Sequence, residues 1–261
     1  MSAEMSGLLI TIPFMVLICL PIFFLTWLAT KYHKVTSLKT DFRNPRKEAI
    51  LSIFVVVAVT IALTGLFFLL YQNKGGTLGT PSEYNLQEVL FQWGLVGALF
   101  ILPVLAVVKA RHLTFETVGI TRKNAGFSIA LGLVLGLIVA IFGILFGSNI
   151  GKLSASNVFY GFVYFSAVGF GEELLMRGYF QTRCISWLGT TKGLILASVT
   201  MALYHLPQRI FAVGLDPLQA LVSAVGLIPI SFAFGFLMLR TKNILGPTFM
   251  HVLIDWVPSV I

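Results

Sequence analysis

Long uninterrupted apolar runs are the feature of this sequence that most restricts its fold. Eight such runs follow one another, at about residues 7–30, 49–71, 90–108, 125–147, from Asn157 past Arg177, 193–209, 217–239 and 244–261. A run of about 20 apolar residues can cross a bilayer as a helix, which satisfies its own backbone hydrogen bonds there. The sequence therefore predicts an all-α polytopic membrane protein of about eight transmembrane helices without a soluble domain.

Composition agrees with this reading. Of the 261 residues, 57% are apolar and 11% are charged, against about 45–50% and about 25% in a soluble domain. The net charge of +8 would suggest nucleic acid as a partner of a soluble protein. Here the basic residues mostly flank the apolar runs, as they do beside a lipid bilayer, so we expect the bilayer as a partner and no nucleic acid.

The distribution of basic residues predicts the orientation. Fourteen Lys and Arg lie in the loops after the first, third, fifth and seventh runs: Lys31, Lys34, Lys39, Arg43, Arg46, Lys47, Lys109, Arg111, Arg122, Lys123, Arg183, Lys192, Arg240 and Lys242. The other side holds Lys74, Lys152 and Arg209. Because cytoplasmic loops carry the excess of Lys and Arg, both termini are expected on the non-cytoplasmic side. The membrane would be the cell membrane of a prokaryote or the endoplasmic reticulum membrane of a eukaryote.

A few ionisable residues lie inside the apolar runs, all of them in the fifth, sixth and eighth. They are Glu172, Glu173, Arg177, His205, His251 and Asp255. A charged side chain at the bilayer centre costs at least ~2.5–3.5 kcal/mol on insertion scales, so these groups are expected to meet one another. Residues four apart share one face of a helix, which predicts that Glu173 pairs with Arg177 and that His251 pairs with Asp255.

Several functions would account for such a cluster. Interhelical hydrogen bonding alone is one, and a proton or ion relay is another. Hydrolysis is a third, because a buried carboxylate can act as a general base on water and a neighbouring histidine can share the proton. A second histidine, oriented by Asp255, could donate to the developing oxyanion. A zinc site formed by Glu172, His205, His251 and Asp255 also stays open.

Three short motifs resemble those of one membrane-protein family. Glu172-Glu173-Leu174-Leu175-Met176-Arg177 matches Glu-Glu-x-x-x-Arg. Met201-Ala202-Leu203-Tyr204-His205 is similar to Phe-x-x-x-His, with Met201 at the aromatic position, and His251-Val252-Leu253-Ile254-Asp255 fits His-x-x-x-Asn/Asp. Together they resemble the CPBP family, which contains the type II CAAX prenyl endopeptidases and the bacterial and archaeal Abi proteins.

The resemblance implies an eight-helix intramembrane endopeptidase without a metal or other cofactor. Glu172 would activate the attacking water with help from His205, and His251 and the residue four later would stabilise the oxyanion. Glu173 and Arg177 would shape the site. Asp255 stands where the best-understood branch has Asn, so it would either orient His251 or contact the oxyanion in its protonated form.

The predicted organisation is one integral membrane domain. Residues 1–124 would form N-terminal transmembrane helices and an interfacial segment, Arg111 to Lys123, and residues 125–261 the catalytic core. The expected substrates are membrane-associated proteins or peptides, with prenylated CAAX-type peptides as the candidate class. The alternatives are a non-proteolytic immunity or scaffold protein of the same fold and an ion-coupled carrier.

Overall fold

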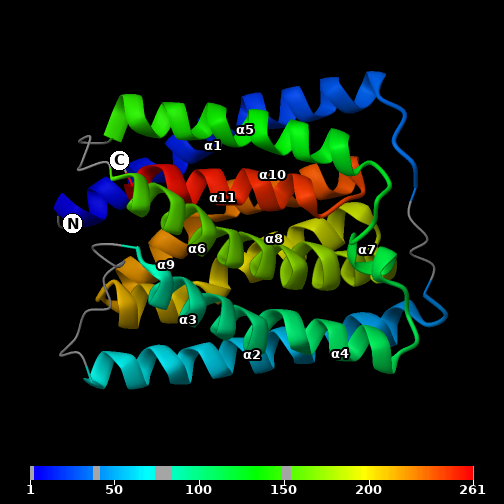
Figure 1. Cartoon of the computed structure of the whole chain (residues 1–261), viewed down its shortest axis with the longest axis horizontal. Coiled ribbons are helices and arrows are strands. Elements are labelled where there is room, and N and C mark those ends of the chain that lie inside the picture. Colours follow the sequence, from blue (N-terminus) through cyan, green and yellow to red (C-terminus); the bar gives the residue numbers. More distant parts are fainter. Residues whose placement is uncertain (1–2, 38–41, 74–83, 148–153, 261) are drawn as a thin grey trace.

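The computed structural model describes residues 3–37, 42–73, 84–147 and 154–260, and within these ranges it contains helices and no strand. The elements in chain order are α1 (Ala3–Tyr32), α2 (Pro45–Asn73), α3 (Leu86–Val96), η1 (Gly97–Ile101), α4 (Leu102–Ala110), η2 (Phe115–Val118), α5 (Ala125–Gly147), α6 (Ala155–Glu173), η3 (Leu174–Gln181), α7 (Thr182–Leu188), α8 (Thr190–Tyr204), η4 (Gln208–Ala212), α9 (Pro217–Gly226), α10 (Ile228–Thr241) and α11 (Leu245–Val260). The long helices run side by side along one axis (Figure 1).

Every predicted apolar run contains helix, and six segments are long and apolar enough to cross a membrane. These six are Met15–Tyr32, Pro45–Gln72, Leu86–Ala110, Ala125–Phe142, Ala155–Leu188 and Pro217–Thr241. The sixth and eighth runs form the shorter helices α8 and α11, of 15 and 16 residues. The all-helical membrane architecture is thus confirmed, while the count of eight spans stays a prediction.

The sixth run differs from its predicted form, a single helix over 193–209. Helix α8 ends at Tyr204, and a π-helical turn, η4, follows at Gln208–Ala212. Pro207 explains the interruption, because proline has no N–H to donate to the carbonyl four residues earlier. The consequence is that His205 lies at the end of α8, with φ −79° and ψ −8°.

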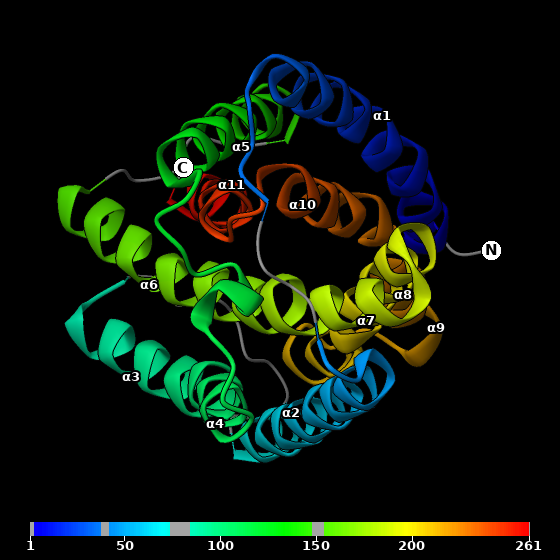
Figure 2. The same cartoon turned by 90° about the vertical axis from the view of Figure 1, so that its right-hand side faces the viewer.

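Helix α11 lies between α5, α6 and α10 when the bundle is viewed along its axis (Figure 2). Glycine permits the closest approaches. A Cβ on Gly132 of α5 would overlap the carbonyl of Gly246 in α11, and a Cβ on Gly169 of α6 would lie 2.8 Å from Cγ2 of Val252. These contacts bring α11 against both neighbours at backbone distance.

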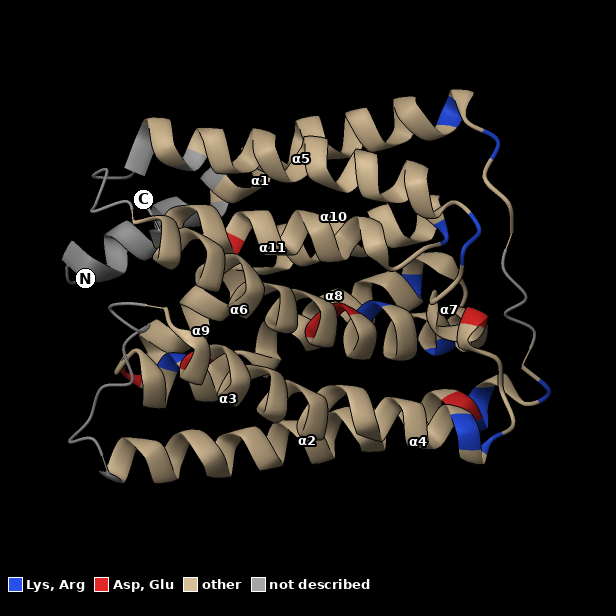
Figure 3. Ribbon diagram, in the orientation of Figure 1, with Lys and Arg blue, Asp and Glu red and all other residues tan. Residues whose placement is uncertain are grey.

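Lys and Arg gather at one end of the bundle (Figure 3), formed by the connections α1–α2, α4–α5, α7–α8 and α10–α11. Helix α1 begins and α11 ends at the opposite end (Figure 1). Of the counted loop bases, Lys39, Lys74 and Lys152 lie outside the described residues. The asymmetry on which the orientation was predicted is therefore present in space, and the orientation itself stays a prediction.

The predicted interfacial segment closes the basic end of the bundle. It contains η2, where Thr117 and Val118 are buried. Gly119 then adopts a left-handed conformation with φ +74°, which glycine reaches without steric cost. Its carbonyl accepts a hydrogen bond from the Ile244 N–H over 3.1 Å, so this segment is fixed directly to the start of α11.

Candidate active site

Glu172 and Glu173 lie at the middle of the longest helical segment, the 34 residues Ala155–Leu188. The α-helix changes to the π-helix η3 directly after Glu173, and all eight residues of η3 are buried. Short π-helical stretches inside α-helices are frequent at functional sites because they re-aim side chains. Here the change occurs within the Glu-Glu-x-x-x-Arg motif.

Glu173 and Arg177 form a fully buried ion pair, with 3.3 Å between Oε2 and Nε and 0% exposure of either side chain. The Arg177 guanidinium also donates to Oγ of Ser231 on α10 over 3.2 Å. Ser231 in turn donates to the carbonyl of Ser198 on α8 over 3.1 Å. The predicted pairing is confirmed, and it ties α6 to α10 and α8.

Glu172 points to other partners. Its Oε1 accepts a hydrogen bond from the Tyr204 hydroxyl over 3.1 Å. Its Oε2 faces Nε2 of His205 at 3.8 Å and Nε2 of His251 at 3.9 Å, both longer than a hydrogen bond. This Oε2 is buried and has no hydrogen-bond partner among the described residues. One carboxylate oxygen is therefore held by tyrosine, and the other lies between two imidazoles.

The neighbours of His205 select its tautomer. Its Nδ1 lies 2.8 Å from the Met201 carbonyl, and a carbonyl can only accept a hydrogen bond. Nδ1 therefore carries the proton, and in the neutral ring Nε2 presents a lone pair toward Glu172. The backbone of Met201 takes part in this contact, so it does not depend on the aromatic side chain that the family motif has at that position.

His251 contacts carboxylates through both ring nitrogens. Nδ1 lies 2.9 Å from Oε1 of Glu173, and Nε2 lies 3.3 Å from Oδ2 of Asp255. The ring also stacks on Phe234, with centroids 5.0 Å apart and planes 18° apart. Since ionised carboxylates only accept hydrogen bonds, either His251 carries two ring protons or a neighbouring carboxyl carries one. The predicted His251–Asp255 pair is confirmed, and Glu173 is a second, shorter contact.

Exposure rises in one direction across the cluster. The exposed fraction is 0% for the Glu173 and Arg177 side chains, 8% for His251, 12% for Glu172, 17% for His205 and 38% for Asp255. Asp255 is thus the open side of the cluster and Arg177 its closed side.

All six residues predicted as a group come together in space. Sequence reasoning missed Tyr204, Ser231 and Phe234, which are uncharged or apolar and give no signal against an apolar background. It also missed the bond between Glu173 and His251, which joins two helices far apart in the chain. Tyr204 had one usable clue, because it immediately precedes a histidine within an apolar run.

The zinc site with four ligands stays a prediction. Among the described residues, no group of three or more His, Cys, Asp or Glu side chains is placed to hold a metal ion. Both ring nitrogens of His251 face carboxylates. Two pockets of the described chain lie elsewhere, one beside Arg240 and one beside Phe170.

Comparison with known proteins identifies the region that contains this cluster. Residues 154–257 match the family described as type II CAAX prenyl endopeptidase Rce1-like. Over this region the chain is similar to the Rce1-like family. The match covers all three motifs and confirms the resemblance to the CPBP family. Neither the curated proteins nor the solved structures gave a match. The Rce1-like family is a protease family, and its members are CAAX-type membrane endopeptidases.

Proposed function

We propose that the chain is an intramembrane endopeptidase in which Glu172 activates water to hydrolyse a peptide bond of a membrane-associated substrate. Oε2 of Glu172 carries this proposal, because it is a buried carboxylate oxygen without a hydrogen-bond partner, flanked by two imidazoles. A general base must lie within hydrogen-bond reach of the proton that it removes, and a water molecule that donates to Oε2 meets this condition.

In the first step Glu172 takes a proton from water, and the water oxygen bonds to the scissile carbonyl carbon. The lone pair at Nε2 of His205 is directed toward Glu172, so His205 can accept or share that proton. Tyr204 holds the other carboxylate oxygen and thereby fixes the direction of Oε2. The positions of all three groups depend on the α6–α8 contact.

In this mechanism the carbonyl oxygen becomes an oxyanion, and His251, with a proton on Nε2, stabilises it. Glu173 holds the opposite nitrogen of this ring, and Arg177 holds Glu173. Return of the proton from Glu172 or His205 to the amide nitrogen breaks the C–N bond and regenerates the carboxylate. Asp255 orients His251 from the open side, by which water and the peptide enter.

For the substrate we propose membrane-associated peptides, with prenylated CAAX-type peptides as the class to test first. This follows the activity of the matched family and the location of Glu172 half-way along a helix long enough to span a membrane. No step requires a cofactor. Metal analysis of the active protein checks this: zinc bound in equimolar amount and lost together with activity on chelation would replace the metal-free mechanism.

The decisive experiment compares the wild-type protein with Glu172→Gln in detergent on matched prenylated and unprenylated CAAX-type peptides. Loss of a general base lowers the rate by about 10²–10⁴-fold, and Gln keeps the size of the side chain. Glu88→Gln, at a half-buried acid on α3, is the matched control and should cleave as the wild type does. Equal cleavage by Glu172→Gln and the wild-type protein would show that Glu172 is not the base.

A non-proteolytic immunity or scaffold protein of the same fold makes a different prediction. Wild-type protein would then cleave neither peptide, and Glu172→Gln would change only its thermal stability. An ion-coupled carrier would instead show transport in liposomes that depends on Glu172 or Asp255.

A further inference from the structure

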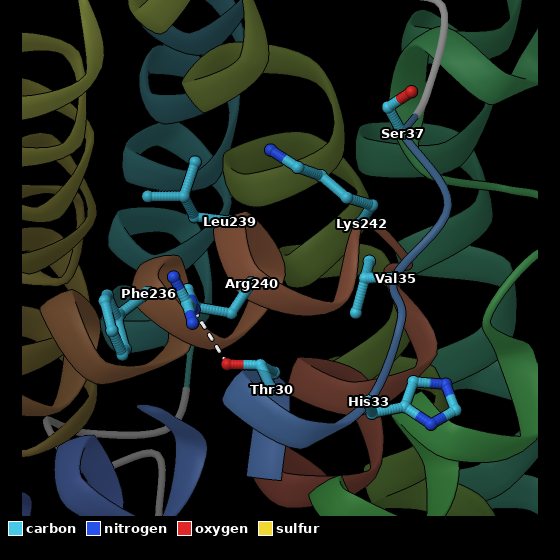
Figure 4. A pocket seen from close by; sticks show the side chains of 8 residues that line it. All are labelled: Thr30, His33, Val35, Ser37, Phe236, Leu239, Arg240 and Lys242. Atoms are coloured by element: carbon cyan, nitrogen blue, oxygen red, sulfur yellow. Dashed lines mark hydrogen bonds between the residues drawn. The ribbon is translucent and has the colours of Figure 1, made fainter. Parts of the chain in front are cut away.

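A pocket of about 450 Å³ lies at the basic end of the bundle and is lined by residues outside the carboxylate and histidine cluster. Figure 4 shows the side chains that line it. It is bounded by the end of α1, the segment after it and the end of α10. Thr30, Val35, Phe236, Leu239, Arg240 and Lys242 form most of its wall. It thus combines apolar walls with two cationic side chains.

Within the part of the chain that the structure describes, the two cations lack acidic partners. Arg240 donates through Nε to Oγ1 of Thr30 over 2.8 Å, as drawn in Figure 4. Among the described residues, no carboxylate forms an ion pair with Arg240 or Lys242, although Arg111 and Lys123 at the same end each have one. Burial, and after it the nearby Arg240, lowers the pKa of Lys242. An anion in the pocket would relieve both effects.

The backbone conformation of Lys242 also supports a bound anion. Lys242 ends α10 in the left-handed conformation, with φ +57°. Glycine is the usual residue at this position because it has no Cβ to strain. The presence of a lysine at this strained position is explained if its ammonium group binds a ligand.

Exposed aromatic residues indicate at which level of the membrane the pocket lies. Trp27 and Tyr32 at the end of α1 are exposed, and the Lys31 ammonium lies 5.1 Å and 5.4 Å from the centres of their rings. Exposed Trp and Tyr are enriched at the level of lipid headgroups. Thr30 belongs to the same turn of α1, so the pocket opens at headgroup level.

We propose that this pocket binds the phosphate group of an anionic phospholipid, held by Arg240 and Lys242. Val35, Phe236 and Leu239 would contact the adjoining glycerol and upper acyl chain. His33, whose ring is fixed by stacking on Phe127 at 3.8 Å, and Ser37 supply further donors at the rim. The site would hold α1 against α10 and does not depend on the hydrolytic function.

The test uses the full-length protein in nanodiscs made of phosphatidylcholine with one fifth phosphatidylglycerol of the same chain composition. Lipids retained after transfer to detergent are counted by native mass spectrometry. Wild-type protein should retain phosphatidylglycerol in excess over phosphatidylcholine. Arg240→Gln/Lys242→Asn should reduce that excess about 25-fold, since a basic residue at an anionic lipid surface contributes about fivefold. Asn tolerates the left-handed conformation of position 242.

Lys109→Gln/Lys192→Asn is the matched control. It removes two exposed bases from the same end of the bundle, outside the pocket, and should retain phosphatidylglycerol as the wild type does. Thermal unfolding in phosphatidylcholine alone confirms that both variants fold. Equal retention of phosphatidylglycerol by the pocket variant and the wild type would overturn the proposed site. An equal loss of phosphatidylglycerol in the pocket variant and the control variant would overturn it as well. If millimolar inorganic phosphate displaces phosphatidylglycerol, the pocket binds free phosphate and not a lipid headgroup.

Discussion

Helix α11 is held on two sides by different chemistry. Against α5 the contact is uncharged and close, with Gly132 and Gly136 facing Gly246 and Leu253 across backbone-level packing. Against α6 the contact includes ions, with His251 placed between Glu172 and Glu173. The contact with α5 fixes the position of α11. The contact with α6 uses that position to bring His251 to the two glutamates.

The difference explains why the ionisable residues are confined to part of the molecule. Close packing by glycine depends on shape alone, so α5 needs no charged residue to hold α11. A buried charge is tolerated only when it is paired, so every ion on α6 and α11 requires a partner across the interface. Three substitutions separate these two kinds of contact.

Glu173→Ala should have the largest effect on stability. It leaves the Arg177 guanidinium buried without its carboxylate, and breaking a buried pair in this way costs about 3–5 kcal/mol. Thermal unfolding in detergent measures the loss. Glu88→Ala, at a half-buried acid that forms no ion pair with the described residues, should change stability by much less. A Glu173→Ala protein as stable as this control would contradict the assignment of Glu173 as the charge partner of Arg177.

Gly132→Ala tests the contact between α11 and α5. Its Cβ would meet the Gly246 carbonyl, and overpacking of this kind costs about 1–3 kcal/mol. Because α11 carries His251, peptide cleavage should fall together with the unfolding temperature. Gly126→Ala, on the same helix, has nothing within 4 Å of the added Cβ and should keep both values. If the two alanine variants behave alike, the α5–α11 contact does not position the site.

Tyr204→Phe should have the smallest effect and act on the reaction. It removes the hydroxyl that holds Glu172 but keeps the ring, so stability should fall by about 1 kcal/mol or less. We expect kcat for peptide cleavage to fall about tenfold with KM unchanged. In the control, Tyr160→Phe, the hydroxyl that is lost forms no hydrogen bond with the described residues, and kcat should not change. A change confined to KM would place Tyr204 in substrate binding.

The sequence predicted those contacts that one helix determines by itself. Glu173 with Arg177, and His251 with Asp255, are four residues apart, and helical geometry alone brings each pair together. The apolar runs likewise predicted every long helix, because the length of a span follows from bilayer thickness.

The sequence predicted that the ionisable residues of three helices meet, but not which atoms pair across the helix interfaces. The bond from His251 to Glu173 joins positions 78 apart, and which carboxylate faces which ring nitrogen depends on the rotation of α6 against α11. The π-helix η3 was equally hidden, because no residue type specifies it. Ser231 could not be found since a serine in an apolar helix more often bonds to its own backbone.

A chain of contacts that starts at Ser198 returns to the helix where it begins. From α8 it passes through Ser231, Arg177, Glu173 and His251. The His251 ring then faces the Glu172 carboxylate at 3.9 Å, and Glu172 leads back to Tyr204 and His205 at the end of α8. Ser198 and His205 are seven residues apart in the sequence, about 10 Å along a helix. The two helical turns between Ser198 and His205 therefore set the distance between the two ends of this chain of contacts. Inserting a single residue between Ser198 and His205 would separate these ends.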